Sequence, residues 1–427
     1  MLRILYITAL LILPAYWANS QNPSPAPKQK EKIVITGGTA HIGNGEVIQE
    51  ATIEFENGKI TKISNKDEIT YDNEAHVIEA KGKHIYPGLI LPDSQLGLVE
   101  IGSVRATNDT RETGELNPNV RSIVAYNTDS RLIPTIRSNG VLMAQIVPGG
   151  GIISGTSSIV QLDAWDWEQA AIKLDNGIHL NWPAKFKSKE NGKRVEREEY
   201  KNTIKKIKKL FDDASAYGKS QKEHDTNPRL KSMQGLFDGS TKLYINTSSP
   251  EEIIESVSFA KEYDIENITI TGVRESAWKV KDFIKEQNVS VILSEIHSLP
   301  SKSHADIWEP SKLPAKFYKE GIPVSLSISW LQGSMNYAFL AGTAAAYGLD
   351  KEEALELVTS IPADIIGIDD RAGTLETGKD ASLIISEGDI LDMKSNNITE
   401  AFIQGRQIDL DNKHKKLYRK YKERYGE

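Results

Sequence analysis

The sequence of residues 242–271, KLYINTSSPEEIIESVSFAKEYDIENITIT, holds one complete strand–helix–strand pattern. Its first five and last five residues are typical of short buried strands. Between them Ser249-Pro250 is a typical helix start, because serine caps a helix and proline fits its first turn. The apolar residues of 251–263 then recur near helical spacing. A helix between two strands predicts a βα unit of a parallel sheet.

Strand-like and helical patterns continue on both sides of this unit. Further strand-like runs lie at 85–91, 141–147, 289–294 and 323–329. A helical pattern follows the last of these runs at 351–360. The number of units and their span favour a closed barrel over an open sheet.

Segments in which apolar residues occur at every second position flank the barrel on both sides. Asn57-Gly58 separates two alternating runs, which is a strong hairpin signal because both residues tolerate positive φ. A strand at 381–385 and a second hairpin at 402–408 follow the barrel. We therefore expect an α/β fold, a closed barrel of βα units plus a small β unit split between the N- and C-terminal segments. The expected division is a signal peptide at 1–20, a linker at 21–31, the split β unit at 32–86 and 371–410, the barrel at 87–370 and a basic C-terminal helix at 411–427.

Composition excludes several classes of protein. The chain has 427 residues, 26% of them charged and 39% hydrophobic, with a net charge of −7. This is an ordinary globular mixture, so fibrous, disordered and polytopic membrane proteins are excluded. The mild acidity gives no electrostatic case for nucleic acid. The absence of cysteine excludes disulfides, thiolate metal ligands and a thiol nucleophile.

The first twenty residues are typical of a secretory signal peptide. Arg3 precedes an apolar run at 4–13, which is too short to span a membrane. Ala18-Asn19-Ser20 fits a cleavage site, so cleavage is expected after Ser20. The proline-rich residues that follow indicate an extended linker. The prediction is a periplasmic or secreted protein with no membrane span after cleavage.

Two charged segments are interpreted as surface helices. Residues 183–235 are rich in Lys and Glu, and their apolar residues from Tyr200 onward mark one face of a long helix. Residues 411–427 are basic, with Tyr418, Tyr421 and Tyr425 on one helical stripe. We expect that stripe to dock onto the body of the protein.

Three further segments carry a family resemblance. These are the hairpin at 56–60, the strand entry at 82–90, which reads GKHIYPGLI, and the long stretch at 359–381. Together they resemble the amidohydrolase superfamily, specifically the imidazolonepropionase-like group. The resemblance covers essentially the whole chain after the signal peptide. It implies a distorted (β/α)₈ barrel with a composite β-sandwich.

The resemblance also implies where a metal site would lie. Members hydrolyse C–N bonds with water activated by one or two divalent metals, held by histidines and an aspartate at the strand ends. The positions of the first two histidines hold Asp93 and Gln95 here. The later positions hold Asn246, Thr271 or Gly272, and Ser329. We therefore expect Asp93, Gln95, Asn246, Thr271 and Ser329 to be substrate-binding residues, with no metal site and no cofactor.

Other polar segments offer weaker candidates. Glu295 and His297 follow a predicted barrel strand, and His304 and Asp306 lie in the same loop. These residue types supply metal ligands or proton transfer, although a polar loop over the barrel accounts for them equally. The glycine-rich residues 148–151 are typical of a turn at the rim of a barrel, and their backbone N–H groups also suit an anion.

Two functional hypotheses remain open from the sequence. The first is a non-catalytic protein that binds a small molecule in the ancestral pocket or supports an active amidohydrolase relative as a partner subunit. The second is an active hydrolase of cyclic amides or dipeptides with a rearranged site, in which Asp93, Glu295, His297 or His304 substitute for the lost groups. Such an enzyme would require a divalent metal such as zinc.

Overall fold

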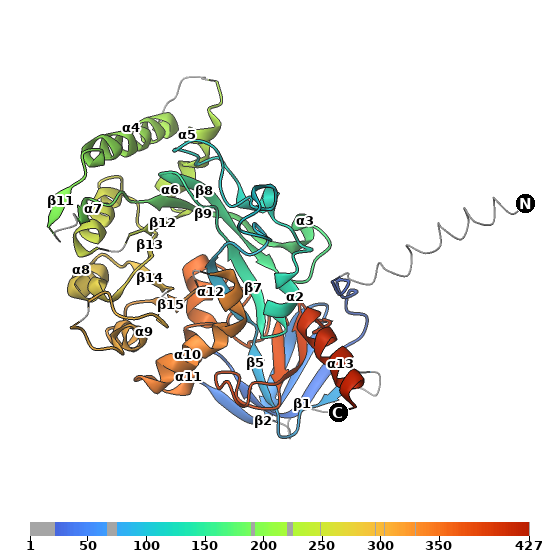
Figure 1. The fold of residues 1–427 in the computed structure, drawn as a ribbon. Coiled ribbons are helices and arrows are strands. Elements are labelled where there is room, and N and C mark those ends of the chain that lie inside the picture. The colour runs from blue at the N-terminus through green and yellow to red at the C-terminus, as the bar shows by residue number, and fades with distance from the viewer. Residues whose placement is uncertain are drawn as a thin grey trace, which may run out of the picture.

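The computed structural model describes residues 22–65, 75–188, 193–219, 225–247, 249–294, 296–302, 304–328 and 330–426. Two eight-stranded sheets dominate these residues, one of them curved into a nearly closed barrel (Figure 1). The predicted α/β fold, a distorted TIM barrel with a composite β-sandwich, is thereby confirmed. The predicted signal peptide lies outside the described residues.

The barrel sheet contains one reversed strand. Its strands, in the order of the sheet, are β6 (Leu89–Ser94), β7 (Val141–Ile146), β8 (Ile153–Gln161), β9 (Ala171–Asn181), β12 (Lys242–Asn246), β13 (Ile268–Thr271), β14 (Ser290–Leu293) and β15 (Val324–Leu326). Strand β8 pairs antiparallel with both β7 and β9, whereas every other pair is parallel. This reversal is the distortion of the regular barrel.

Side chains rather than ladder hydrogen bonds join the two edge strands, β15 and β6. The buried hydroxyl of Tyr337 lies 2.8 Å from the Ile90 carbonyl oxygen of β6 and 2.9 Å from the Leu326 carbonyl oxygen of β15. The Ser327 hydroxyl, just after β15, donates to the Pro92 carbonyl oxygen at 2.7 Å. These contacts hold β6 and β15 beside each other.

Helices cover the outside of the barrel and connect its strands. They are α2 (Leu132–Arg137), α3 (Trp167–Ala170), α4 (Tyr200–Lys219), α5 (Pro228–Ser232), α6 (Gln234–Asp238), α7 (Pro250–Lys261), α8 (Lys281–Glu286), α9 (Glu309–Lys319), α10 (Tyr337–Ala346), α11 (Lys351–Glu356) and α12 (Ser360–Ile366). Helix α7 begins where the sequence predicts. The Ser249 hydroxyl accepts the Glu252 backbone N–H at 3.2 Å, and Ile253 and Val257 are buried.

The second sheet combines strands from both ends of the chain. Its order is β18 (Arg406–Gln407), β17 (Ile398–Ile403), β16 (Leu383–Ser386), β5 (His84–Pro87), β1 (Ile33–His41), β2 (Val47–Glu56) and β3 (Lys59–Asn65), with β4 (His76–Glu79) paired to β1. A small hairpin, β10 (Phe186–Ser188) with β11 (Arg194–Glu196), stands apart. In Figure 1 the blue N-terminal and red C-terminal strands lie together below the barrel.

A buried ion cluster links the second sheet to the barrel. Asp163 lies just after β8, and its side chain is fully buried. Its carboxylate pairs with Arg137 of α2, accepts from Arg406 of β18 at 2.8 Å and accepts the Ala26 backbone N–H at 2.8 Å. Three segments distant in sequence therefore meet at one carboxylate.

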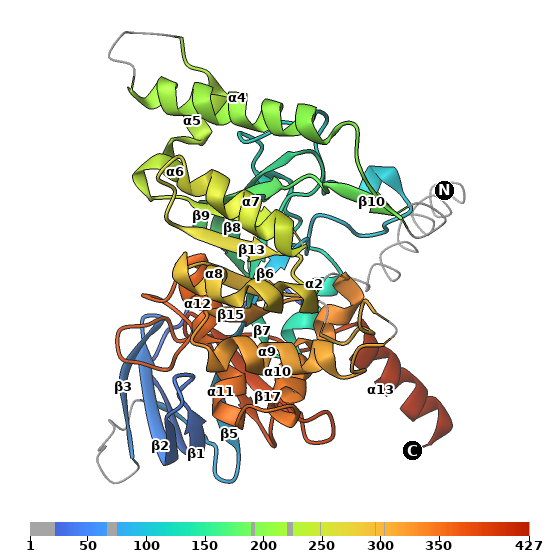
Figure 2. The same cartoon turned by 90° about the vertical axis from the view of Figure 1, so that its left-hand side faces the viewer.

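Two basic helices differ in their packing. Helix α4 buries Tyr200, Ile207 and Phe211 against the body, as its periodicity predicts. Helix α13 (Lys413–Tyr425) buries none of its residues, and it projects from the body in Figure 2. The prediction that the tyrosine stripe of this helix docks onto the body is wrong, because a helix so dense in lysine and arginine stays hydrated. No helix among the described residues is long and apolar enough to cross a membrane.

We predict that Asp163→Asn destabilises the protein by about 3–5 kcal/mol, because it leaves the buried Arg137 guanidinium and the partly buried Arg406 guanidinium without this anion. Urea denaturation monitored by circular dichroism measures this loss. The matched control is Asp213→Asn, which breaks an exposed pair with Lys209 on α4 and should cost less than about 1 kcal/mol. Equal losses in the two variants would contradict the structural importance of Asp163.

Candidate functional site

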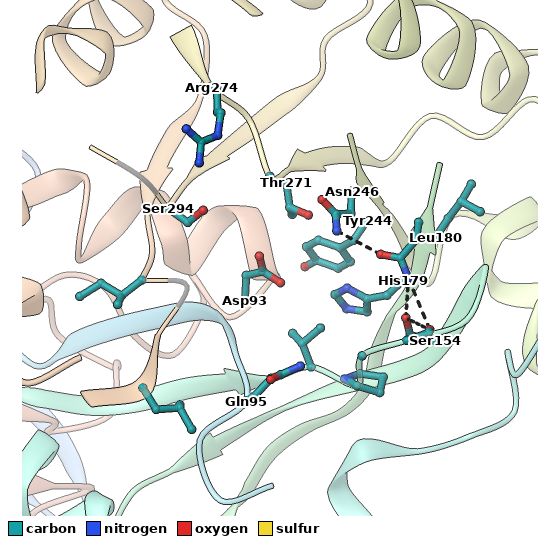
Figure 3. Close-up of a pocket in the computed structure, with 18 residues that line it drawn as sticks. Asp93, Gln95, Ser154, His179, Leu180, Tyr244, Asn246, Thr271, Arg274 and Ser294 are labelled. Atoms are coloured by element: carbon teal, nitrogen blue, oxygen red, sulfur yellow. Dashed lines mark hydrogen bonds between the residues drawn. The ribbon is translucent and has the colours of Figure 1, made fainter. Parts of the chain in front are cut away.

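A polar pocket opens at the carboxyl ends of the barrel strands. Its volume is about 460 Å³, which suits a small molecule. Asp93 comes from β6, His179 and Asn181 from β9, and Tyr244 and Asn246 from β12. Figure 3 shows the side chains of Asp93, His179 and Tyr244 converging from separate strands on one space. This edge of a barrel is where side chains from many strands meet.

Four of the residues proposed from sequence line this pocket. They are Asp93, Gln95, Asn246 and Thr271. The fifth, Ser329, lies outside the described residues, although Ile328 before it lines the same pocket. The glycine-rich turn contributes Pro148, Gly149 and Gly150 to one wall.

The candidates from the loop after β14 lie elsewhere. His297 is not among the pocket-lining residues, and its Nε2 atom lies 2.7 Å from the Thr343 hydroxyl of α10. His304 is exposed and also absent from the lining. Glu295 lies outside the described residues. Of the four groups proposed for a rearranged site, the structure therefore places Asp93 in the pocket.

Asp93 has a strained backbone and a perturbed carboxyl group. Its φ is +50°, a left-handed conformation that Asp and Asn adopt more readily than other side chains. Its backbone N–H donates to Gln145 Oε1 at 3.1 Å, which fixes this turn. Burial raises the pKa of Asp93 to about 6 from its ordinary 3.8. The group therefore changes charge within the range where many enzymes and binding proteins work.

A chain of hydrogen bonds fixes the orientation of His179. The Asn176 amide nitrogen donates to the Ile366 carbonyl oxygen at 3.3 Å, so Asn176 Oδ1 accepts the Ser157 hydroxyl proton at 2.9 Å. Ser157 must then accept from His179, whose Nε2 lies 2.8 Å from its oxygen. The proton of the neutral imidazole is thereby placed on Nε2, which leaves Nδ1 as an acceptor. Burial lowers the pKa of His179 to about 3, so the ring is neutral near pH 7.

Tyr244 completes the floor of the pocket. Its ring stacks on His179 with the centroids 4.6 Å apart, and it packs over Gly177, where a Cβ atom would lie 2.1 Å from the ring. The Asn176 amide donates to its hydroxyl at 3.2 Å. Burial raises the pKa of Tyr244, so its hydroxyl keeps its proton. Figure 3 shows this hydroxyl directed toward the Asp93 carboxylate.

An amide pair forms one side of the rim. Asn246 donates to Asn181 Oδ1 at 3.1 Å, and Asn181 donates to the Gly151 carbonyl oxygen at 3.0 Å and to the Ser154 hydroxyl at 2.9 Å. These bonds link β12 to the glycine-rich turn. Across the pocket, the Arg274 guanidinium extends from the rim toward Ser294 (Figure 3). The pocket thus has an anionic group on its floor and a cationic group at its rim.

Sequence analysis missed His179, Tyr244 and Arg274. Strand β9, which carries His179, was not predicted at all. Tyr244 lies inside a predicted strand and resembles an ordinary core residue. Arg274 follows the β13 strand by three residues, so its position after a strand end was the one available signal.

Comparison with known proteins gives the fold its name. Residues 315–408 match the model of the Amidohydrolase family. An amidohydrolase from Thermotoga maritima has the same fold, with a TM-score of 0.76 and 21% identity over 88% of this chain and 99% of that one. The fold is that of an amidohydrolase.

Two further proteins share this amidohydrolase fold or sequence pattern. A molinate hydrolase aligns with a TM-score of 0.55 and 15% identity over 90% of this chain and 95% of its own. The curated protein "Amidohydrolase tasK" of Hapsidospora irregularis is 21% identical over 372 residues, which is 79% of this chain. The chain spans only 38% of the length of that relative.

The described residues of the pocket do not fit the divalent metal that the amidohydrolase superfamily typically uses. Among the described residues that line it, Asp93 is the only carboxylate and His179 the only imidazole. No group of three His, Asp or Glu side chains able to hold a metal occurs in the described part of the chain. Zinc sites need three or four such donors, and neutral amides are poor substitutes.

We predict that Asp93→Asn changes the pH dependence of stability. Between pH 4 and 6 the folded state holds a proton on Asp93 that the unfolded state has lost, so the contribution of Asp93 to stability falls as pH rises. His179 acts oppositely, because its lowered pKa makes stability fall as pH drops from 6.5 to 3. The two effects offset each other in the native protein.

The difference in unfolding free energy, Asp93→Asn minus native, should therefore rise as pH increases from 4 to 6, by up to about 1.4 kcal/mol per pH unit. Asn is chosen because it tolerates the positive φ. His179→Gln should give a difference of the opposite sign. Denaturant titrations at several pH values measure both slopes, and a difference that stays constant with pH would contradict the burial of Asp93.

We predict that Gly272→Ala disrupts the rim of the pocket. Gly272 has φ +69°, and an added Cβ would lie 2.2 Å from Asn246 Oδ1. The matched control is Gly321→Ala, where φ is +74° and no atom lies within 4 Å. Both variants suffer the same backbone strain, so any additional loss in Gly272→Ala, expected at about 1–3 kcal/mol, reports the displacement of Asn246. Equal unfolding free energies would show that Asn246 moves freely.

Proposed function

We propose that this chain is an exported member of the amidohydrolase superfamily, in the imidazolonepropionase-like group, that binds a small polar molecule without metal-assisted hydrolysis. The observation that carries the proposal is the floor of the pocket. One carboxylate, one neutral imidazole and one protonated tyrosine lie there, in place of the cluster of ligands that activates water in the superfamily.

The arrangement of charge favours a zwitterionic ligand. The Asp93 carboxylate suits an ammonium or amide N–H donor on the floor, and the Arg274 guanidinium suits a carboxylate at the rim. The amide groups of Asn181 and Asn246 supply further hydrogen-bonding partners between them. An amino acid, a dipeptide or a small cyclic amide bearing a carboxylate meets these requirements within about 460 Å³.

The first experiment measures the metal content of the purified protein after dialysis against buffer containing zinc and manganese. The expected result is far less than one metal ion per chain, because the His, Asp and Glu side chains of the described residues do not form a group able to hold a metal. Near-stoichiometric metal that disappears in Asp93→Asn would overturn the proposal of a non-metal site.

The second experiment measures binding by isothermal titration calorimetry with a panel of dipeptides and their C-terminal amides. Arg274→Gln should weaken the binding of dipeptides that have a free carboxylate by about tenfold or more. It should leave the binding of the C-terminal amides nearly unchanged. Lys285→Gln removes the same charge from an exposed position on α8 and serves as the matched control. Equal affinities for acids and amides in the native protein would contradict the assigned role of Arg274.

A second candidate function, hydrolysis at a rearranged site that works without the divalent metal expected from the sequence, is favoured by the state of Asp93. With a pKa of about 6, its carboxylate could accept a proton from water as that water attacks a carbonyl carbon, and then return the proton to the leaving nitrogen. The nearby Tyr244 hydroxyl would donate to the carbonyl oxygen. Turnover of dipeptides that survives chelator and disappears in Asp93→Asn would favour this hydrolase over the binding protein.

A further inference from the structure

The exposed helix α13 has an unusual distribution of charge. It contains seven Lys and Arg residues and one Glu, a net charge of +6 within 13 residues. The whole chain carries −7, so the rest of the protein carries −13. Arg419 pairs with Asp411, just before the helix, at 2.6 Å, and all residues of the helix are exposed.

An apolar stripe runs along this helix between the cations. At about 100° per residue, Leu417, Tyr418, Tyr421 and Tyr425 fall within an arc of about 100°. Their exposed fractions are 39%, 66%, 50% and 70%. Lys413 and Arg424 border the arc on one side, and Lys422 borders it on the other. The stripe is therefore flanked by positive charge along both edges.

Contacts within the helix keep the stripe assembled. The rings of Tyr421 and Tyr425 stack with their centroids 6.4 Å apart, and the Lys422 ammonium lies 5.8 Å from the centre of the Tyr418 ring. At the start of the helix, Asn412 Oδ1 accepts the Lys415 backbone N–H at 3.0 Å, while its amide nitrogen donates to Ser138 at 2.8 Å. The helix is thus capped and anchored to the body at one end, with its apolar stripe facing solvent.

Helix α4 provides an internal comparison. It is also amphipathic and rich in lysine, but its apolar face packs against the body. This packing accounts for the presence of an apolar face on α4. The apolar face of α13 has no such explanation within the described part of the chain. Tyrosines that present ring and hydroxyl together, flanked by long basic side chains, are typical of helices that lie in a lipid headgroup layer.

We propose that α13 binds the surface of an anionic lipid membrane, with its tyrosine stripe in the headgroup region and its lysines and arginines on the anionic headgroups. Charge complementarity selects an anionic partner, since the helix carries +6. The apolar stripe selects lipid over a nucleic acid, because phosphate contacts alone would not require it. A single short helix with few apolar residues gives reversible, peripheral attachment.

The test is sedimentation of the chain after the expected cleavage, residues 21–427, with vesicles of phosphatidylglycerol and phosphatidylcholine, and with vesicles of phosphatidylcholine alone. Binding is expected to the anionic vesicles at low ionic strength and to be lost at 0.5 M salt, where the Debye length is only a few ångströms. Equal binding to both kinds of vesicle, or none to either, would overturn the proposal.

Variants locate the binding on α13. Lys420→Gln with Lys422→Gln should weaken binding by about thirtyfold, since each cation near an anionic surface contributes roughly a factor of five. Lys205→Gln with Lys208→Gln removes the same charge from exposed positions on α4 and should leave binding nearly unchanged. Similar losses in the two double variants would show a diffuse charge effect and contradict a site on α13.

The tyrosine stripe distinguishes a membrane from other partners. Replacing Tyr418, Tyr421 and Tyr425 with Ser keeps the charge and should still reduce vesicle binding at least tenfold, with folding checked by circular dichroism. If the variant binds vesicles as the native protein does, the stripe is not in the headgroup layer. Sedimentation equilibrium without lipid supplies the other decisive outcome, because a dimer abolished by these substitutions would assign the stripe to a second copy of the chain.

Discussion

The buried carboxylate of Asp163 is the constraint that joins the two sheets. Burying one anion is costly, and here the cost is offset by the two guanidinium groups of Arg137 and Arg406 and by the Ala26 backbone N–H. Because Asp163 directly follows β8, these bonds also fix the end of the reversed barrel strand. The same strand begins at the pocket, where Ser154 contacts Asn181. The contact between the two sheets and the wall of the pocket therefore lie at opposite ends of strand β8.

The chemistry of the pocket depends on the direction of its hydrogen bonds more than on the identity of its residues. A single backbone carbonyl, that of Ile366, orients Asn176, and Asn176 in turn orients Ser157 and His179. The imidazole, which burial keeps neutral, is thereby held with its proton on Nε2. A metal ligand would need one ring nitrogen aimed at an ion alongside several other donors. The pocket instead preserves a fixed set of donors and acceptors, which is the property that selective binding of a small molecule requires.

Much of the fold followed from the sequence, because its signals are local. The strand–helix–strand unit at 242–271 and the hairpin at Asn57-Gly58 are set by periodicity and turn chemistry, and both occur in the structure. Strands β8 and β9 were not predicted, although they are the longest of the barrel. Strand β8 is buried throughout despite its glycine and serines, so burial there comes from tertiary packing and leaves no alternating pattern. The exposure of α13 was also mispredicted, because an amphipathic pattern shows that a helix has two faces but not what covers the apolar one.

The site was predictable where position alone decides it. Asp93, Asn246 and Thr271 were proposed because they stand where the family resemblance implies metal ligands, at the carboxyl ends of barrel strands, and the structure places them around one pocket. The state of each group could not be predicted in this way. The raised pKa of Asp93 and the lowered pKa of His179 both come from burial, which only the packed structure supplies.

The two pKa shifts have opposite directions, and this affects the cost of burying the pocket. On folding between pH 4 and 6 the pair exchanges an ionised Asp and a charged His for two neutral groups, so the uncharged pocket costs little desolvation energy there. Above pH 6 the Asp93 carboxylate ionises inside the pocket. The described residues around the floor include no Lys or Arg, so a cationic group of a ligand would stabilise that charge.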